Sequence, residues 1–247
     1  SNGGCRPLTA VARERPLRVA LIDLDGTLMH TAPDLALAAN RVRSEFGLPG
    51  LDEERISQFV GKGTDMLVHR ALTDDIHGRV GEDTFQRARA AFEGHYRAVV
   101  GTHSRVFERV PQALTELREA GLMVGCVTNK PREFTLALLE GAHLLPLLEV
   151  VVAGDDVARR KPHPDLILEA CARLRASPAE TILIVDSAND AQAAHAAGCS
   201  CVLVETGYNE GESVRDLAGA PGVDAIFPSL FDAACWVLQS VPPSARG

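Results

Sequence analysis

Short apolar segments alternate with amphipathic segments along most of the chain, and this alternation predicts an α/β fold. The segments between the apolar runs begin at proline or capping residues and end at glycine, as Pro111 to Gly121 and Pro131 to Gly141 do, which is typical of helices. Strands that alternate with helices form a parallel sheet with right-handed crossovers, covered by helices on both faces. Strands are expected at about 17–22, 122–127, 149–152, 181–185, 201–204 and 225–227.

Residues 32–104 interrupt this alternation, because they carry helix signals and no strand signal. Thr31-Ala-Pro-Asp34 is typical of a helix start with Thr31 as the cap, and Thr64 is expected to cap a later helix. A run of helices directly after the first strand predicts an all-helical cap domain inserted into the core. We therefore expect a loose segment at 1–16, a core from 17–31 and 105–238, a cap at 32–104, and a tail at 239–247 that is disordered from 242 onward.

The first expected strand ends in two carboxylates, Asp23 and Asp25, followed by Gly26. Alternate strand residues point to one face, so both carboxylates would share a face if the strand continued, whereas glycine permits a sharp turn. Two like charges at a strand end repel each other, and a hard, oxygen-preferring cation such as Mg²⁺ would relieve that repulsion. An ordinary strand that leads into an acidic turn is the alternative explanation.

Four polar stretches directly follow expected strands, and in a parallel sheet ligands bind at the carboxyl ends of the strands. The stretches offer carboxylates for a metal and a nucleophile, a hydroxyl and an amide for anionic oxygens, and one positive charge. Phosphoryl transfer requires these groups. Taken singly, the later ones are also explained as helix caps or solvated loop residues, so the inference depends on their combination. The stretches are Asp23-x-Asp25, Thr128-Asn129, Lys161 and Asp186-x-x-x-Asp190.

Asp23-Leu-Asp-Gly-Thr-Leu28 resembles the first signature of the haloacid dehalogenase superfamily, and the three later stretches follow in the order of its other signatures. The resemblance covers about residues 17–238. It implies a three-layer, Rossmann-like core with a cap, and phosphate hydrolysis through an aspartyl-phosphate, with Asp23 as nucleophile and Asp25 as acid and base. The implied site comprises Asp23, Asp25, Thr128 and Lys161 as catalytic residues, Thr27 and Asn129 as substrate-binding residues, and Asp23, Asp25 (through its carbonyl), Asp186 and Asp190 around Mg²⁺.

The flanking residues are similar to the phosphoglycolate phosphatase branch of that superfamily. Thr128-Asn-Lys-Pro131, Lys161-Pro-His-Pro164 and Gly207-Tyr-Asn209 carry this similarity. It implies Mg²⁺-dependent hydrolysis of 2-phosphoglycolate to glycolate and phosphate. A pyrophosphatase, a sugar-phosphate phosphatase and a phosphomutase are alternatives on the same fold, and a non-catalytic binding protein is an alternative of another class.

Three positions depart from that branch. His30-Thr31 stands in place of the usual Asp-Ser, and Val185 replaces the usual glycine before Asp186. The Val185 side chain could crowd a metal site, but its backbone could still form the strand end. Lys62 stands where asparagine is frequent. Because Lys62 is flanked by glycines at a helix start, it is a candidate to bind a substrate carboxylate, and simple exposure explains it equally well.

Composition excludes several classes of protein. The 247 residues, 46% of them hydrophobic, allow one large domain or a domain with an insert. No apolar run is long enough to cross a membrane, the first residues lack the apolar block of a secretory signal, and the formal charge of −8 argues against non-specific nucleic-acid binding. None of the six cysteines has Cys-x-x-Cys spacing. In a chain of this size we therefore expect the thiols to be reduced. We expect a cytoplasmic monomer or homodimer that acts on a small-molecule phosphoester, without nucleic-acid or membrane partners.

Overall fold

A computed structural model describes residues 16–241, so most of the expected loose segment 1–16 and the end of the tail, 242–247, lie outside the described residues. The core is a six-stranded sheet in which every neighbouring pair is parallel, as the sequence predicts. The strands are β1 (Val19–Ile22), β4 (Met123–Val127), β5 (Val150–Val152), β6 (Thr181–Val185), β7 (Ser200–Val204) and β8 (Ala225–Phe227), in the spatial order β5-β4-β1-β6-β7-β8.

Strand β1 lies in the middle of the sheet, between β4 and β6. Its residues alternate between two buried hydrophobic clusters, with Ala20 and Ile22 in one and Val19 and Leu21 in the other. A strand buried on both faces has no polar side, which explains its continuous apolar run. The chain that leaves β1 at Asp23 therefore emerges between the carboxyl ends of β4 and β6.

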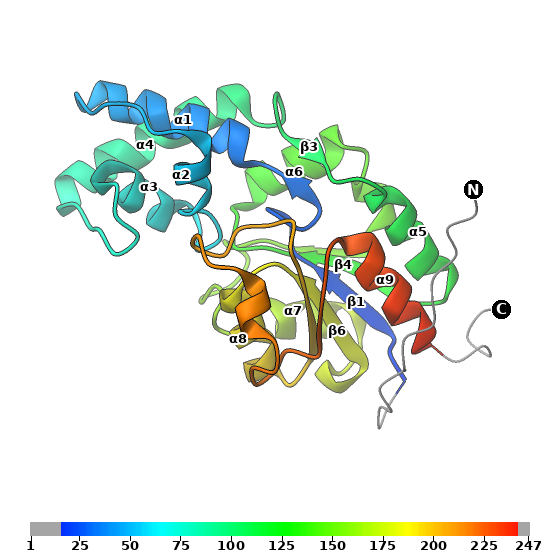
Figure 1. The fold of residues 1–247 in the computed structure, drawn as a ribbon. Coiled ribbons are helices and arrows are strands. Elements are labelled where there is room, and N and C mark those ends of the chain that lie inside the picture. The colour runs from blue at the N-terminus through cyan, green and yellow to red at the C-terminus, as the bar shows by residue number, and fades with distance from the viewer. Residues whose placement is uncertain (1–15, 242–247) are drawn as a thin grey trace.

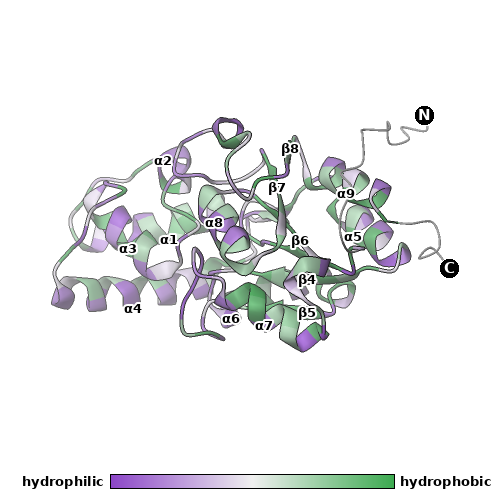
Figure 2. Cartoon of the chain, turned by 90° about the horizontal axis from the view of Figure 1, so that it is seen from below, coloured by the Kyte–Doolittle hydropathy of each residue, from purple (hydrophilic) through white to green (hydrophobic). Residues whose placement is uncertain are grey.

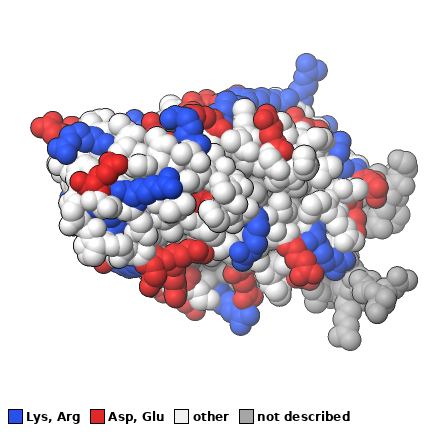
Figure 3. All heavy atoms as spheres, turned by 90° about the horizontal axis from the view of Figure 1, so that it is seen from above, with Lys and Arg blue, Asp and Glu red and all other residues white. Residues whose placement is uncertain are grey.

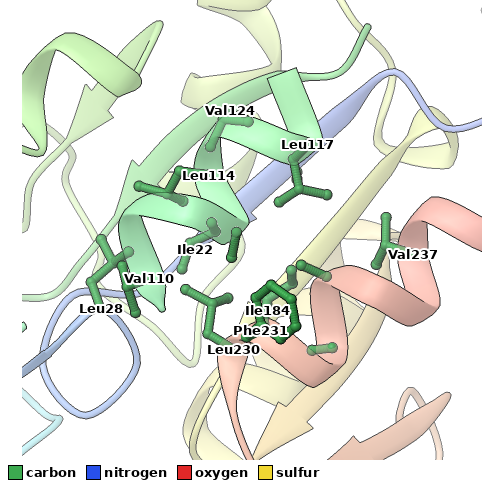
Figure 4. Packing of buried hydrophobic residues seen from close by; sticks show 14 of the residues in the cluster. Ile22, Leu28, Val110, Leu114, Leu117, Val124, Ile184, Leu230, Phe231 and Val237 are labelled. Atoms are coloured by element: carbon green, nitrogen blue, oxygen red, sulfur yellow. The ribbon is translucent and has the colours of Figure 1, made fainter. Parts of the chain in front are cut away.

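Helices cover both faces of the sheet. Figure 4 shows one face, where Leu114 and Leu117 of α5 and Val237 of α9 pack over Ile22 and Val124. Helices α7 and α8 contribute to the cluster on the other face. Hydrophobic residues are concentrated in the strands and in α7, whereas hydrophilic residues are prominent along the cap helix α4 (Figure 2). The core helices are α5 (Val110–Glu119), α6 (Arg132–Gly141), α7 (Asp165–Leu174), α8 (Ala188–Ala197) and α9 (Leu230–Gln239), and α4 spans Glu82–Val99.

The cap is all-helical, as expected, and its helices gather at one end of the molecule (Figure 1). They contribute most of a second hydrophobic cluster, which includes Phe59, Phe92 and Tyr96 and also Phe134 and Tyr208 of the core. Two short strands that the sequence did not predict flank the cap and pair with each other in antiparallel fashion. The additional elements are β2 (Met29–His30), α1 (Ala32–Glu45), α2 (Glu53–Ser57), α3 (Thr64–Thr73) and β3 (Arg105–Val106).

Asp34 ties the two connections between core and cap together. Its carboxylate is fully buried near the start of α1 and accepts hydrogen bonds from the backbone N–H groups of His103 and Ser104 at 2.9 and 3.0 Å. The Ser104 hydroxyl donates a further bond at 2.6 Å. A buried carboxylate with these partners is well satisfied, so the cap enters and leaves the core through one compact junction.

Several local expectations need correction. Thr31 occupies the N-cap position of α1, but its side chain caps nothing and bonds elsewhere. Gly63 precedes α3, so Thr64 is the first helical residue and not the cap. Helix α7 begins at Asp165, later than Pro162, and α8 begins at Ala188, so Asp190 lies in its first turn.

The structure also shows how charges are distributed on the surface and which cysteines are free thiols. Acidic and basic side chains are interspersed on the face shown in Figure 3. Within residues 16–241, no helix combines the length and the apolar character needed to span a bilayer. Cys235 is disulfide-bonded, so the expectation that all six cysteines are reduced is wrong at that position. The free thiols among the described residues are Cys126, Cys171, Cys199 and Cys201, all buried.

Candidate active site

Three buried carboxylates meet at the carboxyl ends of β1 and β6. Asp23 follows β1, Asp186 follows β6, and Asp190 lies in the first turn of α8. One oxygen of each lies within 4.8 Å of an oxygen of the other two. Because β1 and β6 are neighbours in register, segments distant in sequence converge on one point. The structure thus brings together the two acidic stretches that the sequence singled out.

Asp186 is held in one orientation by polar and steric contacts. The Thr27 hydroxyl donates to Oδ1 at 2.8 Å, and the backbone N–H of Tyr208 donates to Oδ2 at 2.7 Å. A Cβ at Gly26 or Gly207 would lie 2.3 or 1.9 Å from Oδ2, which is far inside van der Waals contact. Gly26 also has φ +86°, a conformation that favours glycine. Both positions therefore require glycine for Asp186 to stay in place.

Lys161 supplies the positive charge beside these carboxylates. Its Nζ is buried and lies 3.2 Å from Asp23 Oδ1 and 2.5 Å from Asp190 Oδ1. The backbone of Lys161 is bracketed by Asn129, whose Oδ1 accepts from the Lys161 N–H at 2.9 Å and whose amide donates to the Lys161 carbonyl at 3.1 Å. The ammonium group is thus fixed between the first and the last carboxylate of the cluster.

The charge balance of the cluster favours a cation. Burial raises the pKa of Asp23; Lys161 opposes this rise, while Asp190 and Asp25 add to it. Burial, together with repulsion from Asp23 and Asp190, raises the pKa of Asp186 well above its usual range. One lysine does not compensate three buried carboxylates, and a hard divalent cation bound by carboxylate oxygens would. The donor set therefore fits Mg²⁺.

The Asp25 carboxylate is not part of this cluster and has partners of its own. Its Oδ1 accepts a hydrogen bond from Thr31 Oγ1 at 2.5 Å and from Lys130 Nζ at 3.0 Å. Burial alone would lower the pKa of the Lys130 ammonium group. The interactions with Asp25 and Tyr96 outweigh the effect of burial, so the pKa is raised. The two carboxylates of the first signature therefore have different partners, which is consistent with different roles.

A cavity lies directly above Asp23 and Asp25, between core and cap. The core contributes polar groups, whereas the cap contributes mainly apolar side chains. Thr128 lies at the floor, where its hydroxyl accepts a hydrogen bond from the backbone N–H of Lys130 at 3.2 Å. The lining residues are Asp23, Asp25, Leu35, Val60, Gly61, Gly63, Thr64, Leu67, Phe92, Tyr96, Thr128, Asn129 and Lys130.

Three of the expected site residues have other contacts. Thr27 is fully buried, bonds Asp186 and does not line the cavity. Asn129 lines the cavity, but its amide donates to the carbonyls of Gly61 and Lys161. Lys62 does not line the cavity, and its Nζ lies 2.8 Å from Glu210 Oε1.

The departures at His30 and Val185 also have a structural explanation. Val185 is fully buried in the hydrophobic cluster that includes α7 and α8, and its backbone forms the end of β6, the second of the two possibilities considered for it. The Tyr208 hydroxyl accepts from the backbone N–H groups of Thr31 and Ala32 at 3.0 and 3.1 Å and bonds His30 Nδ1 at 2.8 Å. His30 thus belongs to the core–cap junction.

Sequence reasoning did not assign a role to Lys130, Tyr96 or Tyr208. Lys130 directly follows Thr128-Asn129 at the end of a strand, so the sequence could have indicated that it lies near the site. Tyr96 lies in the cap helix α4, and no pattern in the sequence indicates that its ring reaches the core.

Comparisons with known proteins agree with this architecture. The sequence profile of the family described as haloacid dehalogenase-like hydrolase matches residues 20–204. A phosphoglycolate phosphatase of Nitrosospira multiformis is 43% identical over 225 residues, covering 91% of this chain and 97% of that protein. A phosphoglycolate phosphatase of Escherichia coli K12 is 37% identical, with 87% and 90% covered. The crystal structure of a predicted phosphoglycolate phosphatase from Haemophilus somnus superposes with a TM-score of 0.80 at 29% identity, with 89% and 97% covered.

Proposed function

We propose that this chain, which belongs to the haloacid dehalogenase-like hydrolase family, hydrolyses 2-phosphoglycolate to glycolate and phosphate. The observation that carries the proposal is the cluster of Asp23, Asp186 and Asp190 beside Lys161, of which Asp23 lines the cavity between core and cap. Relatives named phosphoglycolate phosphatase match the chain over most of their length, which favours this substrate among phosphomonoesters.

Asp23 is the proposed nucleophile, and its carboxylate would form an aspartyl-phosphate. It lines the cavity, and its Oδ1 accepts a hydrogen bond from the backbone N–H of Leu24 at 2.8 Å, which fixes its direction. A carboxylate is repelled by a dianionic phosphate, so nearby positive charge must offset the repulsion before attack. Lys161 contacts Asp23 and is placed to provide part of that charge.

Asp23, Asp186 and the backbone carbonyl of Asp25 are the proposed ligands of Mg²⁺, with Asp190 in support. The ion would supply charge neutralisation at the phosphoryl oxygens. Asp190 is held by Lys161 and by the Ser187 hydroxyl, which donates to its Oδ2 at 2.5 Å.

Asp25 is the proposed general acid for the leaving alkoxide and the base for the attacking water. It lines the same cavity as Asp23 and lies two residues after it, within the turn that follows β1. Thr128, which is almost fully buried on the cavity floor, is the proposed donor to a phosphoryl oxygen. The cap, proposed to span 32–104 on a core of 17–31 and 105–238, excludes water from this space. The cytoplasmic location and the monomeric or homodimeric state belong to the same proposal.

A substrate panel tests the function. Purified protein is given 2-phosphoglycolate, pyrophosphate, a hexose phosphate and other small phosphomonoesters, with Mg²⁺ or with a chelator, and released phosphate is measured. The proposal predicts Mg²⁺-dependent release that is most efficient with 2-phosphoglycolate. A higher kcat/KM for pyrophosphate or a sugar phosphate would reassign the substrate, and no release from any ester would contradict the phosphatase function.

A further inference from the structure

We infer that Lys130 and Tyr96 form the site for the anionic end of the leaving group, and that they select short phosphoesters whose carboxylate lies close to the ester oxygen. This inference rests on the proposed function, since it concerns the substrate of the same cavity.

Lys130 is the single basic side chain among the described residues that line the cavity. It is 7% exposed, and its Nζ contacts Asp25 Oδ1 at 3.0 Å. The other lysines of the described chain are engaged elsewhere: Lys161 with Asp23 and Asp190, and Lys62 with Glu210. A second anionic group on a substrate would therefore find its positive partner at Lys130.

Tyr96 provides the second observation. Its side chain is 1% exposed and lines the cavity, and its hydroxyl is hydrogen-bonded to the Lys130 ammonium. Lys130 Nζ lies 5.0 Å from the centroid of the Tyr96 ring, so the ammonium and the ring of this tyrosine are adjacent. An ammonium group only donates hydrogen bonds, so the Tyr96 oxygen accepts from Lys130 and its own O–H is left to donate. A carboxylate oxygen placed beside Lys130 would accept a hydrogen bond from this hydroxyl.

The position of Lys130 also sets the length of the substrate. Lys130 contacts Asp25, and Asp25 is proposed to protonate the ester oxygen. A carboxylate separated from that oxygen by one carbon therefore lies within reach of Lys130. In a longer substrate the carboxylate would lie too far from the ester oxygen to contact Lys130 in the same position.

The apolar side chains of the cap make this contact selective. Leu35, Leu67 and Phe92 form the surrounding wall. A carboxylate transferred from water into such surroundings is unfavourable unless a charged donor pairs with it. An uncharged leaving group gains little from Lys130, so the pair discriminates by charge and not only by size.

Binding of two matched phosphonates tests the inference without turnover. The ligand 3-phosphonopropionate replaces the ester oxygen of 2-phosphoglycolate by CH₂, and propylphosphonate replaces its carboxylate by a methyl group. We expect wild-type protein with Mg²⁺ to prefer 3-phosphonopropionate in calorimetry. Lys130→Met should reduce that preference by about 10- to 100-fold, Tyr96→Phe should reduce it by a smaller factor, and Lys130→Arg should retain part of it. Arg41→Met, which removes an exposed cation of the cap, should not change it.

The outcomes are distinguishable. Circular dichroism establishes that each variant is folded, and each comparison is a ratio between two ligands, so a general loss of affinity cancels. If Lys130→Met keeps the wild-type preference, or if Lys62→Met abolishes it, the inference is overturned. If the preference depends on Lys130 but the wild type releases no phosphate from any ester, only the proposed function fails.

Discussion

Thr31 Oγ1 donates a hydrogen bond to Asp25 Oδ1 at 2.5 Å. Thr31 is the last residue before the first cap helix, and Asp25 lines the cavity that the cap covers. The backbone N–H of Thr31 is bonded in turn to Tyr208, which follows Gly207 beside Asp186. The junction of the cap and Asp25, the proposed acid–base residue, are therefore parts of one hydrogen-bonded unit, so displacement of the junction would displace the Asp25 side chain.

Thr31→Val removes this bond while it preserves the shape of the side chain. We expect kcat for 2-phosphoglycolate to fall by about 10- to 100-fold, a fraction of what general acid–base catalysis contributes, because Asp25 loses its orientation. The affinity for 3-phosphonopropionate should change much less. Thr102→Val, at an exposed position of the same region, is the matched control. An unchanged kcat in Thr31→Val would show that the bond does not orient Asp25.

Lys161→Met removes the ammonium from between Asp23 and Asp190. The two buried carboxylates are then left unpaired, so we expect a loss of about 3 to 5 kcal/mol in the free energy of unfolding in the presence of a chelator. Mg²⁺ should restore part of that stability by replacing the missing charge. Urea denaturation with and without Mg²⁺ measures both effects. Lys62→Met, which breaks a more exposed pair with Glu210, should cost at most about 1 kcal/mol. Equal losses in the two variants would contradict this reading of the cluster.

Gly207→Ala places a methyl group 1.9 Å from Asp186 Oδ2, so either the loop or the carboxylate must move. We expect the Mg²⁺-dependent rise in melting temperature to be lost and phosphate release to fall strongly. Gly94→Ala serves as the comparison, because Gly94 lies within helix α4 with nothing near its added Cβ. That variant should be more stable by about 0.5 to 1 kcal/mol. The reading fails if Gly207→Ala retains a wild-type response to Mg²⁺.

Glu210 links the core to the cap through Arg70 at 2.5 Å and Lys62 at 2.8 Å. Burial alone would raise the pKa of Glu210, but the hydrogen bonds from Lys62 and Arg70 outweigh it and lower the pKa below the usual 4.5. A depressed pKa in the folded state stabilises the fold above the unfolded value, and this stabilisation is lost as the pH falls through the folded value.

Glu210→Gln should therefore be less stable than the wild type at neutral pH. The difference in melting temperature should shrink as the pH falls from about 4.5 through the lower folded-state pKa, because below that value both proteins carry an uncharged group at this position. Thermal denaturation of both proteins across this range measures it. A difference that stays constant with pH would mean that the charge of Glu210 is not involved.

The sequence predicts the sheet well because its central strands are buried. Strands such as β1 and β6 appear as continuous apolar runs, and the polar residues that follow them mark the binding edge. The parallel arrangement then implies that Asp23 and Asp186 lie near each other, as they do. Short pairings such as β2 with β3 carry no comparable signal, because two-residue strands have no periodicity.

Contacts between core and cap were not predictable in the same way. Lys62 was a candidate for the substrate carboxylate, but its partner Glu210 comes from a distant loop that reaches the cap. Thr31 has the sequence signature of a helix cap, yet a carboxylate competes for its hydroxyl. Lys130 acquires its role only when α4 places Tyr96 over it. These contacts depend on how the cap packs on the core, which no local pattern encodes.

The most direct test of the account is to trap the covalent intermediate. Protein with Mg²⁺ is mixed rapidly with 2-phosphoglycolate that carries a labelled phosphate, quenched in acid, and digested for mass spectrometry. The account predicts a labelled acyl-phosphate on the peptide that contains Asp23, and none in Asp23→Asn, whereas Asp83→Asn at an exposed position of α4 should behave as wild type. Turnover that persists in Asp23→Asn, or label on another residue, would contradict it.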